Sequence, residues 1–255
     1  GRTTLAGEGL QHQDGHSHIL SSTIPNCLSY DPTFSYEVAV IIKDGIKKMY
    51  VDQKNYFYYI TTTNENYEHP PMPKGAEEGI VKGMYKLIES KAPAIRLLGS
   101  GSILNESIRA KSILDNYGIE SEIWSVTSFN LLRKDGMEVE RYNQLNPTKK
   151  EKQAYVEECF KNASIPVIAS TDYMRSYAEQ IRPYIKDDFT VLGTDGFGRS
   201  DSRNSLREFF EIDANSIVRA SAYTLFKNGT LDKKKLKEIY DDLEVDPLKP
   251  NPWEV

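Results

Sequence analysis

Cysteine is scarce in this sequence: among 255 residues there are only Cys27 and Cys159. Their separation matches no zinc or redox spacing, so no disulfide framework is predicted and a reduced, cytoplasmic compartment is favoured. Apolar runs of membrane-spanning length and blocks of Lys or Arg are also lacking. With a net charge of −5, we therefore expect no nucleic-acid partner and no membrane partner.

Several catalytic signatures are missing as well. There is no Gly-x-Ser-x-Gly elbow, no P-loop and no His-Glu-x-x-His motif, so nothing indicates the hydrolases, nucleoside triphosphatases or zinc proteases that carry them. What the chain has is enough length and apolar content, 39% of its residues, for one large domain or two small ones. It begins at Gly1 without methionine, and we expect it to be the later part of a longer protein.

Three of the four histidines lie in one short polar segment, residues 7–18, which we call the histidine loop. Its candidate site residues are His12, Asp14, His16 and His18. Imidazole titrates near neutral pH, and the glycines and Asp14 favour a loop. His16 and His18 are two positions apart, so an extended chain would point both the same way. The segment is a metal site, a loop whose rings are satisfied by backbone and water, or an active-centre loop for proton transfer or oxyanion stabilisation; we favour the last.

Hydrophobic patterning predicts an α/β fold. Proline-rich residues 64–79 disfavour both helix and central strand, so we place a domain boundary there, with domains at 1–72 and 73–255. In the first domain, strands at 23–30 and 55–63 flank a helix opened by residues 31–33. In the second, strands and helices alternate, which indicates a mostly parallel sheet covered on both faces. Its strands are expected at 80–89, 94–98, 122–126, 165–170 and 189–193, its helices at 103–117, 172–184, 205–211, 214–228 and 231–243, with an irregular region at 134–152.

Two glycine-rich turns follow predicted strands. Residues 99–102, Gly-Ser-Gly-Ser, could cradle a phosphate, with Glu120 or Glu122 as the ribose-binding acid of a dinucleotide-binding oxidoreductase. Position 104 is leucine where that fingerprint needs a third glycine, so a tight turn without a ligand is favoured. Residues 192–203 bring four charges to the same edge of the sheet, where we favour a structural or interface role. Residues 170–173 are interpreted as a helix cap.

Several longer motifs occur along the whole chain. They are Gly-Arg-Thr-Thr-Leu (1–5), Gly-Glu-Gly-Leu-Gln-His (7–12), Asp-Gly-His-Ser-His (14–18), Ile-Pro-Asn-Cys (24–27), Leu-Gly-Ser-Gly-Ser (98–102), Ala-Ser-Thr-Asp-Tyr-Met (169–174) and Gly-Thr-Asp-Gly-Phe-Gly-Arg-Ser-Asp-Ser-Arg (193–203). Together they closely resemble the C-terminal portion of the homodimeric bacterial pyruvate dehydrogenase, the thiamine-diphosphate-dependent decarboxylating component of that complex, in the transketolase-like superfamily. The resemblance implies the end of a pyrimidine-binding domain followed by a transketolase-type C-terminal domain.

The resemblance also implies a function. The full enzyme would decarboxylate pyruvate on thiamine diphosphate with Mg²⁺ and transfer the acetyl group to the lipoyl group of the dihydrolipoyl acetyltransferase core. The cofactor would lie between the subunits of a homodimer. In this family the histidine loop lines the active-centre channel, so His12, Asp14, His16 and His18 carry over as catalytic candidates. Gln13 departs from the family pattern, in which an acid is expected.

The family's diphosphate–Mg²⁺ motif, Gly-Asp-Gly followed by Asn about thirty residues later, is absent from the chain. We therefore expect this chain alone neither to bind thiamine diphosphate tightly nor to turn over. The competing interpretation is a structural and dimerisation module that takes no part in chemistry.

Overall fold

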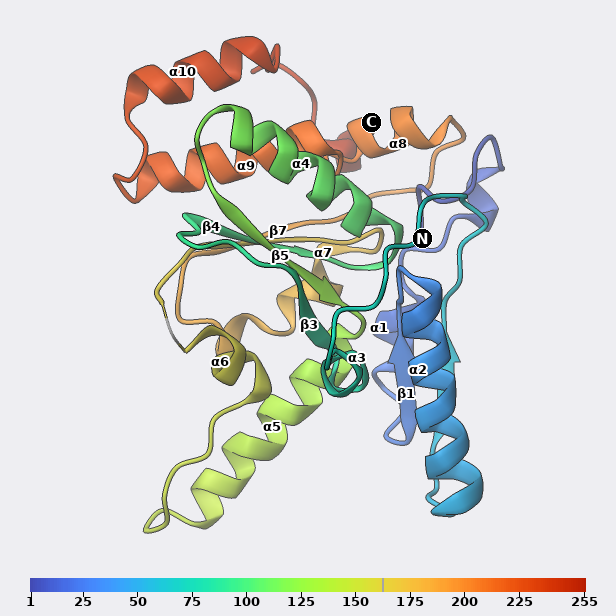
Figure 1. The fold of residues 1–255 in the computed structure, drawn as a ribbon. Helices are drawn as coiled ribbons and strands as arrows, with labels where there is room; N and C mark the ends of the chain where they lie inside the picture. Colours follow the sequence, from blue (N-terminus) through green and yellow to red (C-terminus); the bar gives the residue numbers. More distant parts are fainter. Residues whose placement is uncertain (162) are drawn as a thin grey trace.

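The fold contains two separate β-sheets (Figure 1). The computed structural model describes residues 1–161 and 163–255. In the smaller sheet, β1 (Cys27–Tyr30) and β2 (Phe57–Ile60) pair in parallel, with α2 (Ser35–Ile46) between them along the chain. The larger sheet has the strand order β3-β5-β4-β6-β7. Its strands are β3 (Met84–Ile88), β4 (Ile95–Gly99), β5 (Ser121–Val126), β6 (Val167–Ser170) and β7 (Phe189–Leu192).

The larger sheet is buried on both faces. Strands β4 to β7 run parallel, and only β3 lies antiparallel, along β5. In β4, Ile95 and Leu97 point into one apolar core while Leu98 points into a second core. This alternation follows from the two-residue period of a strand, and a strand apolar at consecutive positions is suited to a parallel sheet with two covered faces.

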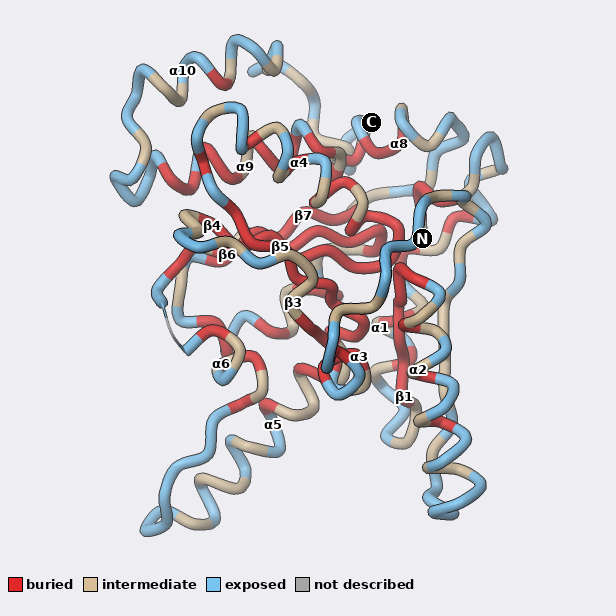
Figure 2. The backbone as a smooth tube through the Cα atoms, viewed as in Figure 1, coloured by how far each residue is buried: buried red, intermediate tan, exposed pale blue. Residues whose placement is uncertain are grey.

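Helices cover the two faces, as Figures 1 and 2 show. α4 and α9 pack on one face, with α10 outside α9, while α5, α6 and α7 lie toward the other. The helices of the chain, in addition to α2, are α1 (Ser17–Ser21), α3 (Glu77–Lys82), α4 (Leu104–Asn116), α5 (Phe129–Leu145), α6 (Tyr155–Phe160), α7 (Arg175–Glu179), α8 (Arg203–Phe209), α9 (Ala214–Lys227) and α10 (Lys233–Asp242). Short 3₁₀-helical turns occur at Leu10–His12, Gly101–Ile103, Arg182–Tyr184 and Pro252–Glu254, and a π-helical turn occurs at Lys47–Val51. Over the described ranges, no helix is long and apolar enough to cross a membrane.

The predicted α/β class and mostly parallel sheet are confirmed. The predicted strand at 80–89 is wrong in its first half: α3 occupies that part, ends at Gly83 in a left-handed conformation (φ 114°), and only then does β3 begin. A positive φ at the residue after a helix favours glycine, so Gly83 was the available signal.

The expectation of irregular structure at 134–152 is wrong for residues 134–145, which belong to α5, and is confirmed for residues 146–152, which form neither helix nor strand. α5 begins after Ser128, whose hydroxyl accepts a hydrogen bond from the Leu131 amide at 3.1 Å. α5 projects from the body of the molecule in Figure 1, and it buries few side chains. Between residues 134 and 145 charged and polar residues outnumber apolar ones, so this part of the sequence resembles a loop. The predicted helix at 172–184 is likewise shorter, being α7 followed by the turn at Arg182–Tyr184.

Glu37 of α2 joins the smaller sheet region to the larger sheet. It is fully buried, and its carboxylate accepts hydrogen bonds from the Thr33 and Phe34 amides at 2.5 and 2.9 Å. It also accepts bonds from the Tyr85 hydroxyl on β3 at 2.7 Å and the Ser125 hydroxyl on β5 at 2.6 Å. Burial raises the pKa of Glu37, and the four donors oppose that rise. A buried carboxyl group is tolerated only when its oxygens are bonded in this way.

We predict that Glu37→Ala lowers the free energy of unfolding by about 3 kcal/mol or more, because four buried donors lose their acceptor. Glu37→Gln should cost less, since its amide oxygen can still accept two of these bonds. Denaturant titration of the two variants checks this order. Glu68→Ala, at an exposed acid, is the matched control and should change the free energy by less than about 0.5 kcal/mol. Equal effects at positions 37 and 68 would contradict the role of Glu37.

Candidate active-centre loop

Asp14 shapes the histidine loop. One of its carboxylate oxygens accepts hydrogen bonds from the amides of His16 at 2.9 Å and Ser17 at 3.0 Å, at the start of α1. Burial would raise the pKa of Asp14, but its hydrogen bonds from Ser17 and His16 outweigh burial and lower the pKa. Asp14 is therefore ionised, and it holds the backbone just before α1, where a negative charge suits the positive end of the helix dipole.

The expectation that His16 and His18 point the same way is wrong. His16 is the residue before the first turn of α1 and is exposed, whereas His18 lies within α1 and is completely buried. The helix begins between the two residues, so the two-residue period of an extended chain does not apply. His12, in the short turn Leu10–His12, is exposed as well. The loop thus presents two imidazoles to solvent and buries the third.

His18 lies in an aromatic cage. Its ring stacks on Tyr177 at 4.8 Å between centroids and meets the edges of Tyr173 and Tyr59 at 4.6 and 5.4 Å. Its Nε2 lies 3.1 Å from the hydroxyl of Thr61, which in turn donates to the Asp31 carboxylate at 2.7 Å. Burial lowers the pKa of His18 in spite of the opposing charge of Asp31. The buried ring is therefore neutral near neutral pH.

Two buried groups that the sequence analysis did not name as site residues, Arg2 and Asp172, hold the start of the chain. Asp172 accepts hydrogen bonds from the Thr3 amide at 3.0 Å and the Thr3 hydroxyl at 2.7 Å. Burial raises the pKa of Asp172, and the bonds from Thr3 act against that rise. The guanidinium of Arg2 bonds to the carbonyl of Gly196 and lies 3.5 Å from Nε2 of His16. The interpretation of residues 170–173 as a helix cap is thus wrong, because Asp172 binds residue 3 instead.

The structure gives no support to a metal site. Across the described ranges there is no group of three or more His, Cys, Asp or Glu side chains that could hold a metal ion. The loop histidines diverge, since His18 is buried while His12 and His16 are exposed, and the guanidinium of Arg2 lies 3.5 Å from Nε2 of His16. A guanidinium beside the ring repels a metal cation, so the metal interpretation of the loop is not sustained.

The glycine turn after β4 does not fit a dinucleotide. The Asp31 carboxylate already lies against it: the Ser100 hydroxyl donates to Asp31 at 2.7 Å, and a Cβ on Gly101 (φ 53°) would come within 2.6 Å of a carboxylate oxygen. Glu122 lies near the opposite end of the sheet, where it pairs with Arg96 at 2.8 Å. A phosphate would meet the Asp31 carboxylate here, so the turn does not support the dinucleotide-binding alternative.

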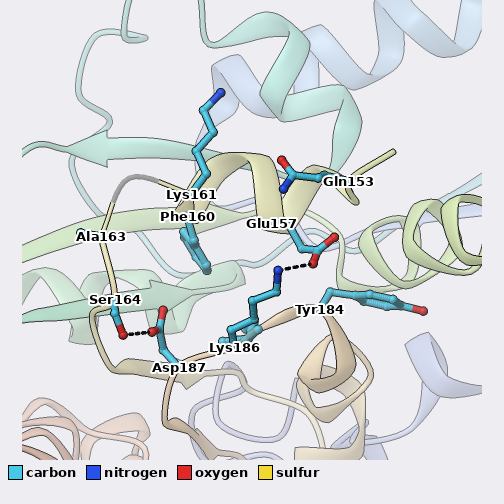
Figure 3. Close-up of a pocket in the computed structure, with 10 residues that line it drawn as sticks. Gln153, Glu157, Phe160, Lys161, Ala163, Ser164, Tyr184, Lys186 and Asp187 are labelled. Atoms are coloured by element: carbon cyan, nitrogen blue, oxygen red, sulfur yellow. Dashed lines mark hydrogen bonds and ion pairs between the residues drawn. The ribbon is translucent and has the colours of Figure 1, made fainter. Parts of the chain in front are cut away.

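The pocket in Figure 3 lies at a different place in the fold. It measures about 300 Å³ and lies between α6 and residues 184–187, before β7 begins. In this pocket Lys186 pairs with Glu157 at 3.3 Å, and the Ser164 hydroxyl donates to Asp187 at 2.5 Å. No residue of the histidine loop lines this pocket.

We predict that His18 makes stability depend on pH below its ordinary pKa of 6.5. Its pKa is lower in the folded chain, so its contribution is complete above pH 6.5 and is lost as pH falls through the folded value. Free energies of unfolding from about pH 7.5 to 5 should fall less steeply for His18→Gln than for the unmutated chain. His16→Gln, at an exposed ring of the same loop, is the control. Identical slopes for His18→Gln and the unmutated chain would contradict the prediction.

Family models and curated relatives match this chain over most of its length. Residues 1–70 match the family model described as the pyruvate dehydrogenase E1 component middle domain, and residues 83–213 match the transketolase-like C-terminal domain. The chain is 56% identical to the pyruvate dehydrogenase E1 component of Pseudomonas aeruginosa and 54% identical to that of Escherichia coli K12, over 99% of the chain in both cases. It spans only 29% of the length of either relative.

Solved structures show the same fold. A transketolase mutant from Pichia stipitis superposes with a TM-score of 0.65 at 16% identity, over 90% of this chain and 29% of that one. Transketolase from Campylobacter jejuni gives 0.62 at 19% identity, over 84% of this chain and 29% of that one. The resemblance inferred from the sequence motifs is therefore confirmed. The chain belongs to the transketolase-like proteins and, among them, to the family of the pyruvate dehydrogenase E1 component.

Proposed function

We propose that the full-length protein oxidatively decarboxylates pyruvate on thiamine diphosphate and transfers the acetyl group to a lipoyl domain. The observation that carries the proposal is the 54–56% identity to pyruvate dehydrogenase E1 components over nearly the whole chain. The histidine loop supports the proposal, because His12 and His16 are exposed there. The neighbouring backbone is held by hydrogen bonds of Thr3 to Asp172 and of the His16 amide to Asp14. This chain would supply one wall of the active centre.

The loop residues then take different roles. His12 and His16 are the rings available to exchange a proton with substrate or to stabilise a developing oxyanion. Asp14 holds the backbone from which His16 projects. The sequence made His18 a catalytic candidate together with His12 and His16. Because its ring is completely buried in the aromatic cage, we assign it a positioning role.

The chain's own residues do not fit the cofactor. No Gly-Asp-Gly occurs in the sequence, and over the described ranges no group of acids or histidines could hold Mg²⁺. When bound, thiamine diphosphate supplies the carbanion-stabilising centre for decarboxylation. The diphosphate and Mg²⁺ would be held by parts of the longer protein that this chain does not include.

Assembly and location complete the proposal. We infer a homodimer, working with the dihydrolipoyl acetyltransferase core in the cytoplasm. Exposed apolar side chains near the loop, Leu10, Leu20 and Phe197, support burial against another surface. The free state of both cysteines accords with a reducing compartment. We retain domains at 1–72 and 73–255, supported by the two separate sheets. A dimerisation module without chemistry is the alternative function.

We predict that His12→Ala and His16→Ala in the full-length enzyme lower the rate of lipoyl acetylation from pyruvate about 10²-fold or more, the usual contribution of a general acid or base. His69→Ala, at the fourth histidine, is the matched control because its ring accepts a bond from the Ser35 amide outside the loop. Unchanged acetylation in both loop variants would favour the dimerisation module.

This 255-residue chain by itself should not bind thiamine diphosphate with Mg²⁺ at micromolar affinity, since it lacks the diphosphate motif. Calorimetric titration checks this, with circular dichroism to verify that the chain is folded. The full-length protein is the positive control. A dissociation constant of micromolar or below for the chain alone would refute the assignment of the cofactor to other segments.

A further inference from the structure

The histidine loop is fastened along one side to residues 196–203, which follow β7. The Gly7 amide donates to the Asp201 carbonyl at 3.0 Å, and the Ser200 hydroxyl donates to the Glu8 carbonyl. Residues 192–203 had been expected to play a structural or interface role. The contacts show that the segment braces the loop that carries the exposed histidines.

Gln13 makes the central contact of this brace. Its Oε1 accepts a hydrogen bond from the Arg199 amide at 2.7 Å, and its Nε2 donates to the Arg199 carbonyl at 2.5 Å. The side-chain amide thus acts as a peptide group would, with one donor and one acceptor engaged on the same residue. Gln13 is 8% exposed, so both bonds are sheltered from competing water.

The neighbouring residues allow this approach. A Cβ on Gly198 would come within 2.9 Å of the Leu10 carbonyl and 3.2 Å of the Gln13 Cβ, so the close contact requires glycine. The Arg199 side chain turns to the ring of Phe209, 4.5 Å from its centroid, which leaves the Arg199 backbone free for Gln13. The site is therefore shaped for an amide at position 13.

Gln13 also lies in the chain between the two exposed histidines, His12 and His16. The backbone amide of Gln13 donates to the Leu10 carbonyl at 3.2 Å, and this bond closes the short turn that carries His12. Asp14, the next residue, accepts a hydrogen bond from the His16 amide at 2.9 Å. Movement of Gln13 would therefore displace both rings.

We propose that Gln13 is a positioning residue, which locks the histidine loop onto Arg199 and so holds His12 and His16 in place for the reaction. The inference rests on the proposed function. A carboxylate at position 13 retains the bond from the Arg199 amide but cannot donate to the Arg199 carbonyl, whereas a protonated carboxyl group can do both. The charged and titratable groups on residues 7–18 and 196–203 are Glu8, His12, Asp14, His16, His18, Arg199, Asp201 and Arg203, and Arg2 lies beside His16.

The test compares Gln13→Leu, Gln13→Glu and Gln144→Glu in the full-length protein. Gln144 is exposed on α5, so Gln144→Glu makes the same change of side chain away from the histidine loop. We measure hydrogen-exchange protection of residues 7–16 and the pH profile of kcat for acetyl transfer. Gln13→Leu should lower protection and kcat about tenfold at every pH, with KM for pyruvate unchanged. Gln13→Glu should show a smaller loss at high pH that recovers as its carboxyl group protonates.

Gln144→Glu should match the unmutated protein in both measurements. The proposal is overturned if Gln13→Leu leaves protection or kcat unchanged, or if Gln13→Glu shows no recovery at low pH. If the unmutated protein transfers no acetyl group, the proposed function fails, and unchanged protection in Gln13→Leu would then separately overturn the lock.

Discussion

Buried carboxylates hold this structure together, because each must find hydrogen-bond donors and finds them on a distant segment. Asp31 follows β1 and is bonded by Ser100 after β4 and by Thr61 after β2. Asp172 follows β6 and is bonded by Thr3. Glu37 on α2 is bonded by side chains of β3 and β5. The two sheets and the start of the chain are thereby tied through polar contacts that tolerate little displacement.

These contacts place the histidine loop at the carboxyl edge of the large sheet. Strands β4, β6 and β7 end there, and parallel α/β sheets usually carry their functional residues at that edge. Three sets of hydrogen bonds hold the loop. Asp172 binds Thr3 just before it, residues 196–203 bind it through Arg199 and Gln13, and Asp14 binds the His16 amide within it. A polar surface segment is thus given a defined shape without a disulfide or a metal ion.

Much of the fold could be predicted from the sequence. The strands near 95–99, 121–126, 167–170 and 189–192 are short apolar runs between turn residues, and burial on both faces leaves them few alternatives. α5 was missed because it buries little, and α3 because its apolar residues merged with those of β3. Burial against neighbours decides such elements, and a single sequence does not show those neighbours.

The sequence by itself determined the class of fold, the family and the loop that carries the histidines, since motif spacing and strand periodicity are local properties of the chain. Only the tertiary structure decided which histidine is buried. His18 is enclosed by Tyr59, Tyr173 and Tyr177, residues far from it in sequence, while His12 and His16 stay exposed. The same holds for Asp31, which fills the glycine turn that a phosphate would need. Long-range packing sets the dielectric surroundings and charge partners of a side chain, and these decide what its chemistry can be.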